Sequence, residues 1–550
     1  MKNRPYPLYM TLPQLENVRQ MLEIKASTCP DKVAFRYMPT RKVIVEKTYK
    51  EVYQEARYLA TYLLKRGVRN RNIALMGENS YQWLISFLAI IISGNVAVLL
   101  AKEFSATEVG VLMAQTDTDL IVASKNCIKV LEPGKKKLGR VRIMDLSEVD
   151  EWIDKGRKFY ERGRHPLDGI NIDVDKPCAI FFTSGTSGSS KAVLHTQRSL
   201  MTNINQSAKN FLPPENSSTM AVLPFNHAFG LNTSVLMAFH YGVDIFINSS
   251  LADFMKEIPV AKPTVLFLVP LFVETFSKTI WRTAKKQGRE KTLRRGMALS
   301  DAMLKVGVDK RQELFKDVLG KFGGRLQYII CGGAPLDPHY VKEFRSLGIE
   351  LLNGYGITEC APVLSVNRNF HYRDGSVGQI LDGVSIRIYE PDENGIGEIQ
   401  ARGDNVMVGY YHDEASTEDA FLDGWYRTGD LGYVDKDGFL FITGRAKNLI
   451  ILANGENVSP EELEQTIDLF PEVGEVVCYE ENGAITAEIF PDDTLEIDPE
   501  EARKNIEAHI KAFNATMPNY KKIHKIRFRS TEFEKTATKK IKRYQVGKKN

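Results

Sequence analysis

Residues 179–191 have the sequence AIFFTSGTSGSSK, in which an apolar segment is followed by hydroxyl residues and glycines and ends in a lysine. The apolar residues Ala179–Phe182 predict a buried strand. Glycines let the next stretch of backbone bring its N–H groups close to a ligand, while the hydroxyls and Lys191 add donors and a positive charge. This chemistry suits a polyphosphate, although taken alone the stretch fits an ordinary flexible Gly/Ser loop equally well.

The spacing of this loop differs from that of the P-loop NTPases. Lys191 follows Gly188 by three residues, and Ala192 stands where the Walker pattern requires serine or threonine. The sequence therefore disfavours a P-loop NTPase, and the meaning of the loop depends on the rest of the chain.

Composition indicates a large globular protein without a nucleic-acid partner. The chain has 550 residues, 43% of them hydrophobic, and its 73 basic residues nearly balance its 69 acidic ones. The six cysteines have no CxxC spacing, which argues against a disulfide framework and a zinc site, and the N-terminus lacks the pattern of a secretory signal. We expect a cytoplasmic protein. From Lys535 onward the sequence has seven basic residues and no acidic one, so a solvated or lipid-contacting tail is an alternative for that segment.

Residues 84–101 are apolar enough to resemble a membrane span. Ser93-Gly94-Asn95 interrupts the stretch, and Gly94 suits the C-terminal cap of a helix. We therefore predict a buried helix near 81–93 followed by a buried strand at 96–100, and not a transmembrane helix.

Short apolar strands alternate with helical patterns through about the first 350 residues, which predicts parallel sheets covered by helices. The expected strands are 73–76, 96–100, 120–123, 179–182, 220–223, 243–247, 265–269 and 328–330. Residues 278–322 predict a helical insertion on the surface. After about residue 375, short strands with Gly and Asp turns predict a small β-rich unit such as a barrel. From about residue 447 an α+β segment follows, with helices at 460–469 and 499–515 and strands at 474–480 and 484–490.

Four further glycine-studded segments have polar chemistry like that of the first. They are Cys331-Gly332-Gly333-Ala334-Pro335, Asn353-Gly354-Tyr355-Gly356-Ile357-Thr358-Glu359, Trp425-Tyr426-Arg427-Thr428-Gly429-Asp430 and Gly444-Arg445-Ala446-Lys447-Asn448. Each alone has a structural explanation as a turn, a core residue or a solvated helix end. Together, in this order and spacing, they resemble the adenylate-forming superfamily of acyl-CoA synthetases, luciferases and peptide-synthetase adenylation domains, and bacterial long-chain fatty acyl-CoA synthetases above all.

The resemblance implies an α/β fold with two domains. Residues 1–446 would form a large N-terminal adenylation domain of two helix-covered sheets plus a small β-barrel-like unit, which holds ATP and the acyl chain. Residues 447–550 would form a small, mobile α+β C-terminal domain, with the hinge at Lys447.

The resemblance also implies a role for each motif in binding ATP. The β- and γ-phosphates would lie against the loop residues Thr183, Ser184, Gly185, Thr186, Ser187, Gly188 and Lys191. Adenine would lie between Tyr355 and the run Gly333, Ala334 and Pro335. Asp430 and Arg445 would bind the ribose hydroxyls.

By the same resemblance, Thr358 would contact the α-phosphate and Glu359 would bind Mg²⁺, a cation that prefers carboxylate and phosphate oxygens. Lys540 would bridge the substrate carboxylate and the α-phosphate, where it offsets charge that develops as pyrophosphate leaves. Lys539 stands where the family usually has glycine, so two adjacent lysines compete for this role.

For the substrates, Gly455 lies in a segment that resembles the pantetheine tunnel, and His227 lies in one that resembles the corner of the acyl pocket, although an isolated histidine is more often structural. We therefore predict a ligase that joins medium to long fatty acids to CoA with ATP and Mg²⁺. A ligase for an acyl carrier protein, a fatty acyl-AMP ligase, and a non-catalytic nucleotide or acyl sensor remain alternatives. The basic tail also predicts weak contact with the inner membrane surface.

Overall fold

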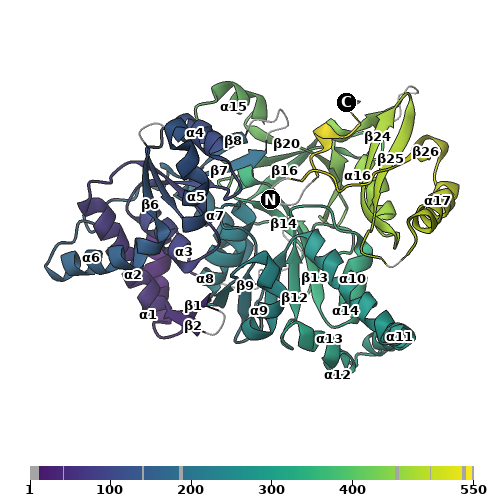
Figure 1. Ribbon diagram of the computed structural model, residues 1–550, viewed down its shortest axis with the longest axis horizontal. Helices are drawn as coiled ribbons and strands as arrows, with labels where there is room; N and C mark the ends of the chain where they lie inside the picture. Colours follow the sequence, from purple (N-terminus) through teal and green to yellow (C-terminus); the bar gives the residue numbers. More distant parts are fainter. Residues whose placement is uncertain are drawn as a thin grey trace.

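The computed structural model describes residues 12–40, 43–138, 141–184, 190–452, 457–495, 497–535 and 541–547. A large N-terminal domain contains three sheets, and a small C-terminal domain lies beside it at one end of the molecule (Figure 1). The predicted α/β class, with helices on the faces of mainly parallel sheets, is confirmed.

The first sheet has nine strands in the order β15-β14-β13-β12-β11-β9-β10-β1-β2. The strands in the centre of this sheet pair in parallel. The strands at its two ends pair antiparallel, β1 with β2 at one end and β13, β14 and β15 at the other. The strands are β1 (Val33–Thr40), β2 (Val43–Thr48), β9 (Ser218–Ala221), β10 (Asp244–Ile247), β11 (Val265–Leu268), β12 (Tyr328–Cys331), β13 (Glu350–Gly356), β14 (Val363–Val366) and β15 (Gln379–Ile380). Strand β9 ends at Ala221, two residues earlier than predicted, before the chain turns at Pro224.

The second sheet has seven strands in the order β18-β8-β7-β4-β3-β5-β6. They are β3 (Asn72–Met76), β4 (Val96–Leu100), β5 (Leu120–Ala123), β6 (Arg142–Asp145), β7 (Pro177–Ser184), β8 (Ser190–Thr196) and β18 (Gly409–Tyr410). The strand predicted at Ala179–Phe182 is the centre of β7, which pairs in parallel with β4 and antiparallel with β8. The predicted phosphate loop therefore connects two paired strands near one end of this sheet, inside the edge strand β18.

The apolar stretch at 84–101 forms a helix, a turn and a strand, as predicted. Helix α3 (Tyr81–Ile92) begins at Ser80, whose side chain accepts a hydrogen bond from the backbone N–H of Trp83. Gly94, with φ +75°, follows the helix and leads the chain into β4. Within the described ranges, the structure contains no helix that is both long and apolar enough to cross a membrane.

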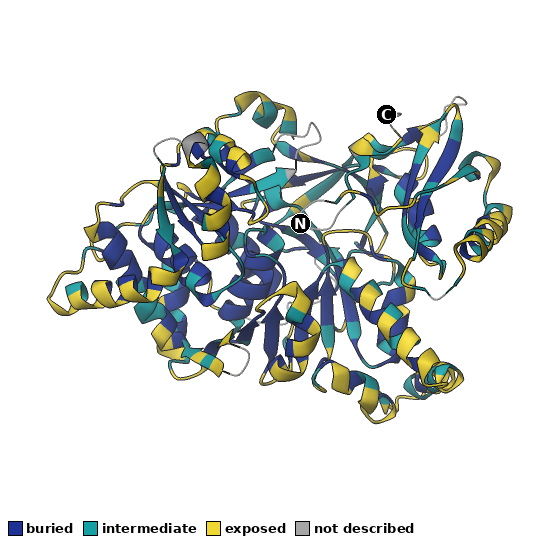
Figure 2. Cartoon of the chain, in the orientation of Figure 1, coloured by how far each residue is buried: buried dark blue, intermediate teal, exposed yellow. Residues whose placement is uncertain are grey.

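Helices cover both sheets and bury a shared core (Figure 2). They are α1 (Val18–Thr28), α2 (Tyr49–Lys65), α4 (Ala106–Gln115), α5 (Lys125–Leu131), α6 (Val149–Glu161), α7 (Gln197–Ala208), α8 (Ala238–Tyr241), α9 (Phe254–Ala261) and α14 (Pro338–Ser346). Residues Phe229–Met237 form a π-helix, η3, a rare widened helix that often occurs at functional sites.

The predicted helical insertion is confirmed and begins earlier than expected. Helix α10 (Pro270–Lys286) starts with proline in its first turn. Backbone N–H groups there make no hydrogen bond within the helix, so proline, which has no N–H, is tolerated. Helices α11 (Glu290–Lys305), α12 (Arg311–Leu314) and α13 (Lys316–Lys321) follow.

The predicted β-rich unit is a five-stranded antiparallel sheet. It consists of β16 (Ser385–Tyr389), β17 (Gly397–Arg402), β19 (Phe421–Leu422), β20 (Trp425–Val434) and β21 (Leu440–Arg445), with α15 (Glu414–Ala420) beside it. The stretch 377–388 contributes to two sheets, because β15 joins the nine-stranded sheet while β16 joins this one.

The C-terminal domain has its own apolar core. Its elements are β22 (Ile450–Ile451), β23 (Asn457–Val458), α16 (Pro460–Ile467), β24 (Val473–Glu481), β25 (Ala484–Pro491), α17 (Pro499–Thr516) and β26 (Ile523–Phe528). It contacts the N-terminal domain through Arg282 of α10, whose Nη2 lies 2.7 Å from Oδ2 of Asp492. Ser459 precedes α16, as predicted, but its hydroxyl donates to Glu461 and makes no capping bond to the helix backbone.

Candidate functional site

The predicted ribose-binding pair is a hydrogen-bonded ion pair across two neighbouring strands. Asp430 on β20 lies opposite Arg445 on β21, and Oδ1 of Asp430 is 2.7 Å from Nε of Arg445. The other carboxylate oxygen, Oδ2, accepts a hydrogen bond of 2.7 Å from the hydroxyl of Tyr355 on β13. Residues far apart in sequence therefore meet at one carboxylate.

This carboxylate is held in place and still has acceptor capacity. Asp430 is 5% exposed, whereas half of the Arg445 side chain is exposed. Burial and the neighbouring carboxylate raise the pKa of Tyr355 well above its usual value, so Tyr355 stays protonated and acts as a donor. A carboxylate has about four lone-pair positions, of which two are used here, so two remain for ligand hydroxyls.

The predicted adenine-binding residues come together at the ends of adjacent strands. Strands β12 and β13 run in parallel with Cys331 opposite Asn353, which brings the segment Gly332–Pro335 beside Tyr355. A β-carbon on Gly332 would lie 3.1 Å from the carbonyl oxygen of Gly354, so this close approach favours glycine. Residues 333–335 are exposed and can contact a ligand.

The turn that carries Thr358 and Glu359 is fixed through its backbone. The carbonyl oxygen of Thr358 lies 2.8 Å from Nε2 of His195 on β8. A carbonyl only accepts, so Nε2 carries the proton, and Nδ1 accepts from the hydroxyl of Ser199 at 2.9 Å. Complete burial lowers the pKa of His195 to about 4, which keeps the ring neutral at physiological pH. His195 thus ties β8 to the Thr358 turn.

Three asparagines hold the rest of this turn. Nδ2 of Asn203 donates to the carbonyl of Val363 at 2.7 Å, and Nδ2 of Asn405 donates to that of Cys360 at 3.0 Å. Nδ2 of Asn232, from the π-helix η3, donates to the carbonyl of Ala361 at 3.0 Å. The turn is therefore connected to α7, to η3 and to the segment before β18.

The carboxylate of Glu359 lies between aromatic side chains. Its Oε1 accepts a hydrogen bond of 3.2 Å from the hydroxyl of Tyr410 on β18, and burial raises the pKa of Glu359. The ammonium of Lys191 lies 4.5 Å from the centre of the Tyr410 ring, a cation–π contact. Tyr410 thereby connects the last residue of the predicted phosphate loop to Glu359.

Residues His195, Tyr410 and the three asparagines were missed by the sequence reasoning. Alternation along β8 could have indicated that His195 lies on the same face as Lys191, because the two are four residues apart in a strand. Tyr410 carried no local signal, since it reaches Lys191 only through the pairing of β18 with β8.

His227 lies in the turn between β9 and η3, at the predicted acyl corner. Its backbone N–H donates to the carbonyl of Pro224 at 3.2 Å, and its own carbonyl accepts from Leu231 at 3.0 Å. Phe229 follows, and its ring would be 3.7 Å from a β-carbon on Gly332. The acyl corner therefore lies next to the predicted adenine segment.

Several predicted residues cannot be placed. The loop residues Gly185, Thr186, Ser187 and Gly188, together with Gly455, Lys539 and Lys540, lie outside the described residues, and so does the side chain of Ser184. Thr183 lies on β7 opposite Lys191 of β8, and Lys447 is an exposed residue in the short helical turn η6 (Ala446–Asn448).

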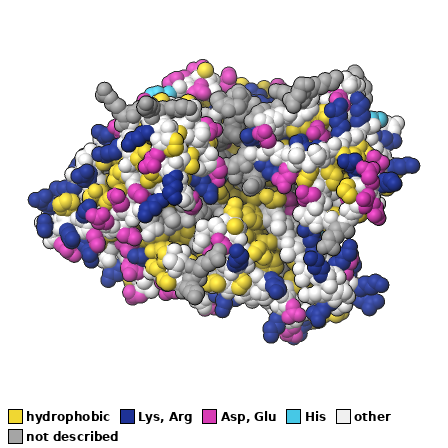
Figure 3. Space-filling view, in the orientation of Figure 1, with side chains coloured by type: hydrophobic (Ala, Val, Ile, Leu, Met, Phe, Trp, Pro, Cys, Tyr) yellow, Lys and Arg dark blue, Asp and Glu magenta, His cyan; other side chains and the backbone are white. Residues whose placement is uncertain are grey.

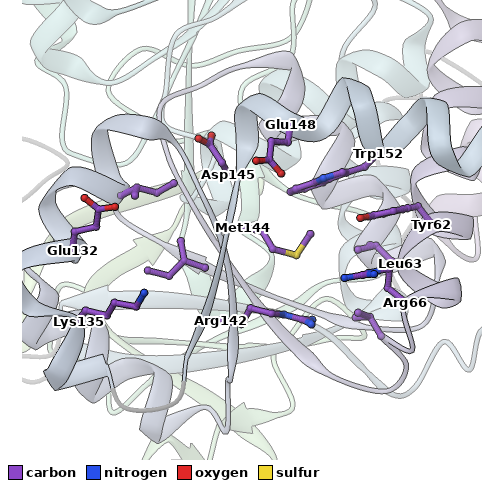
Figure 4. A pocket seen from close by; sticks show the side chains of 13 residues that line it. Tyr62, Leu63, Arg66, Glu132, Lys135, Arg142, Met144, Asp145, Glu148 and Trp152 are labelled. Atoms are coloured by element: carbon purple, nitrogen blue, oxygen red, sulfur yellow. The ribbon is translucent and has the colours of Figure 1, made fainter.

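A cavity of about 380 Å³ occurs elsewhere, between α2, the segment after α5, β6 and α6 (Figure 4). Stacked Tyr62 and Trp152 form one wall, and Arg66 and Arg142 lie at its rim. None of the predicted site residues lines it, so this cavity is separate from the site.

Comparison with known proteins identifies the family. The sequence model of the AMP-binding enzyme family matches residues 22–411, and that of the AMP-binding enzyme C-terminal domain matches residues 447–549. This chain therefore belongs to the AMP-binding enzymes, and its fold is the α/β adenylate-forming fold with a large N-terminal and a small C-terminal domain.

Among relatives, the long-chain-fatty-acid–CoA ligase FadD15 of Mycobacterium bovis is 26% identical over 604 aligned positions, covering 100% of this chain and 98% of the relative. The structure of the anthranilate CoA ligase AuaEII with anthranoyl-AMP has a TM-score of 0.78 at 21% identity, covering 97% of each chain. That of a Mycobacterium tuberculosis fatty acyl CoA synthetase has a TM-score of 0.66 at 22% identity, covering 96% of each.

Proposed function

We propose that this protein is an AMP-forming ligase that joins medium to long fatty acids to CoA. In the first reaction, a carboxylate oxygen of the fatty acid attacks the α-phosphate of ATP, the bond to pyrophosphate breaks, and acyl-AMP forms. In the second, the thiol of CoA attacks the acyl carbon, AMP leaves, and the thiol proton passes to solvent. The products are acyl-CoA, AMP and pyrophosphate.

The observation that carries this proposal is the convergence of Asp430, Arg445 and Tyr355 next to the chain segment that holds Glu359. These residues come from separate strands, yet they form one polar site beside the glycines of the β12–β13 edge. The full-length similarity to long-chain-fatty-acid–CoA ligases supports the choice of substrate class.

The chain's own residues would bind and orient ATP. Asp430 would accept hydrogen bonds from the ribose hydroxyls while Arg445 holds its carboxylate in place. The ring of Tyr355 and the exposed segment 333–335 would enclose adenine. Thr183 and Lys191 would contact the β- and γ-phosphates, so that the α-phosphate faces Thr358 and the approaching carboxylate.

Glu359 fits the role of a magnesium ligand. Within the described part of the chain, no group of three or more His, Cys, Asp or Glu side chains could form a complete metal cage. Mg²⁺ at nucleotide sites is bound by one or two carboxylates together with substrate phosphates and water, which is what a single oriented carboxylate provides. When bound, Mg²⁺ would neutralise phosphate charge.

We further propose a domain boundary between residues 446 and 447, with Lys447 as the hinge. The position of Lys447 in an exposed turn directly after β21 supports this division. Lys540, or Lys539 beside it, would contact the α-phosphate during adenylation, and the segment around Gly455 would line the path of the CoA thiol.

Isotope exchange tests the first reaction. Labelled pyrophosphate should enter ATP when a fatty acid is present and not when it is omitted. The second reaction is tested with fatty acids of graded length, with and without CoA, while AMP and thioester are measured. The absence of exchange with every acid would reject the enzyme in favour of a nucleotide or acyl sensor.

The thiol acceptor distinguishes the remaining alternatives. Formation of AMP and thioester with CoA supports the CoA ligase, whereas acyl-AMP that reacts only with a carrier protein, or with no thiol, indicates an acyl carrier protein ligase or an acyl-AMP ligase. Action in the cytoplasm and weak contact of the basic tail with a membrane stay predictions, which cell fractionation tests.

A further inference from the structure

A corner of the N-terminal domain combines positive charge with exposed apolar side chains. It lies on α11 and the loop after it and consists of Lys291, Arg295, Leu299, Lys305, Val306 and Val308, which we call the α11 corner. Helix α11 lies at the lower right edge of the molecule (Figure 1), and Lys and Arg side chains gather in this region of the surface (Figure 3).

The apolar side chains of this corner are unusually exposed. Val306 is 76% exposed, Leu299 is 52% exposed and Val308 is 42% exposed. They lie in the last two turns of α11 and in the loop that follows, where Gly307 turns the chain with φ +78°. A cluster of exposed large apolar side chains is typical of an interaction surface, whereas single ones are common on any protein.

The helix presents its two faces to different surroundings. Lys291, Arg295 and Leu299 follow one another at intervals of four residues, and Val306 follows Leu299 by seven, so these side chains share one face. The opposite face is anchored, because Leu293 and Met297 pack against the core and the hydroxyl of Ser300 donates to the carbonyl of Ser346 at 2.9 Å. The outer face is therefore held in a fixed orientation toward solvent.

The charges on this face are available to a partner. In the part of the chain that the structure describes, Lys291, Arg295 and Lys305 have no ion pair, whereas Arg294 on the flank of the same helix pairs with Glu290 at 3.0 Å. Lys285 and Lys286 at the end of α10 add further exposed charge. Positive charge that is not neutralised by an ion pair among the described residues fits an anionic partner.

We propose that the α11 corner docks on an anionic lipid bilayer. The headgroup phosphates of such a bilayer would bind the charges of Lys291, Arg295 and Lys305. The apolar layer just beneath them would take up the side chains of Leu299, Val306 and Val308. An acidic protein would complement the charge but would need its own apolar recess for the protruding Val306. Contact through this corner is distinct from contact through the basic C-terminal tail.

Vesicle co-sedimentation of the full chain tests this surface. Phosphatidylcholine vesicles with about 30 mol % phosphatidylglycerol should bind the protein, and pure phosphatidylcholine vesicles should bind it much less. Each basic side chain near an anionic bilayer strengthens binding by about fivefold, so Lys291→Glu with Arg295→Glu should weaken it by about 25-fold or more. Val306→Ser keeps the charge and should weaken binding by about fivefold through lost insertion. The tryptophan fluorescence of Val306→Trp should shift to the blue when anionic vesicles are added, because the side chain enters apolar surroundings.

Two controls separate this surface from general electrostatics and from misfolding. Lys504→Glu with Lys511→Glu makes the same charge change on exposed positions of α17 and should leave vesicle binding within about twofold. Pyrophosphate exchange with a soluble, medium-chain fatty acid should be unchanged in all these variants, because the corner contains no site residue. Vesicle binding needs no turnover, so this test can fail independently of the proposed ligase activity.

Three results would overturn the proposal. The first is a wild-type protein that does not sediment with anionic vesicles. The second is that the Lys291/Arg295 double variant binds vesicles as well as the wild type does, while Lys548→Ser with Lys549→Ser in the C-terminal tail loses vesicle binding. The third is that Val306→Ser binds vesicles as well as the wild type does and that the tryptophan fluorescence of Val306→Trp does not shift. The protein would then be attracted by charge alone, without insertion of this side chain.

Discussion

Replacing Asp430 with asparagine tests the ribose-binding part of the site. In the structure, Oδ1 of Asp430 pairs with Arg445 and Oδ2 accepts from Tyr355, both at 2.7 Å. Asparagine has nearly the same shape but is neutral, and its NH₂ group cannot accept a hydrogen bond. Asp430→Asn therefore removes the ion pair and lowers the acceptor capacity of the side chain without creating a cavity.

The expected cost follows from the hydrogen bonds that ATP would make. A hydrogen bond to a charged group contributes about 1.5–3 kcal/mol, and the loss of one such bond to a ribose hydroxyl corresponds to about a 10- to 150-fold weaker interaction. We expect the KM for ATP in pyrophosphate exchange to rise within this range. The KM for the fatty acid should change much less, because Asp430 is assigned to the ribose and the segment around His227 to the acyl chain.

The assay compares ATP with its 2′-deoxy and 3′-deoxy analogues. The wild-type protein should use less well the deoxy analogue that lacks the hydroxyl bound by Asp430, because the hydrogen bond from that hydroxyl is lost. Asp430→Asn should show much less of this discrimination. Asp435→Asn is a matched control, since Asp435 lies just after the same strand and forms an ion pair with Arg373 away from the site. Equal use of ATP and both analogues by the wild type, or an unchanged KM for ATP in Asp430→Asn, would refute this assignment.

Three further predictions test other parts of the site. Tyr410→Phe removes the hydroxyl that donates to Glu359, so the Mn²⁺ concentration needed for half-maximal binding in the presence of ATP should rise about tenfold, and an unchanged value would exclude this role. The folded-state pKa of His195 is about 4, below its unfolded value near 6.5, so the folded state binds fewer protons between these values. As the pH falls from about 6.5 to about 4, the free energy of unfolding of the wild type, measured by chemical denaturation, should drop by up to about 3 kcal/mol more than that of His195→Gln. If the two proteins lose stability in parallel, the ring of His195 is not buried and neutral. Gly332→Ala should lower stability by about 1–3 kcal/mol and weaken ATP binding, because its β-carbon would press on the Gly354 carbonyl, whereas Gly320→Ala, which meets no atom within 4 Å, should do neither.

Local sequence patterns were sufficient to predict many of the strands and several of the helices. The apolar run at 84–101 was correctly divided at Gly94, because a glycine at a helix end adopts the left-handed conformation that other residues avoid. The helices at 460–467 and 499–516 and the strands between them also follow from hydrophobic periodicity and proline at the first helical turn. These signals act over a few residues, so they survive without tertiary information.

Details that depend on pairing between distant segments were not predictable. The stretch 377–388 divides between two sheets, and β18 joins the edge of the seven-stranded sheet although it lies more than 200 residues after β8. No local preference of these residues specifies the partner, because strand pairing is decided by packing of the whole domain.

The same division applies to the site. The sequence by itself determined the types of group available: a glycine-rich loop with Lys191, the carboxylates Glu359 and Asp430, and the guanidinium of Arg445. Only the tertiary structure decided that Asp430 is held by both Tyr355 and Arg445, that Tyr410 joins Lys191 to Glu359, and that His195 fixes the Thr358 turn. The physical reason is that chemistry belongs to a side chain, whereas orientation and burial arise from contacts between segments that are far apart in the chain.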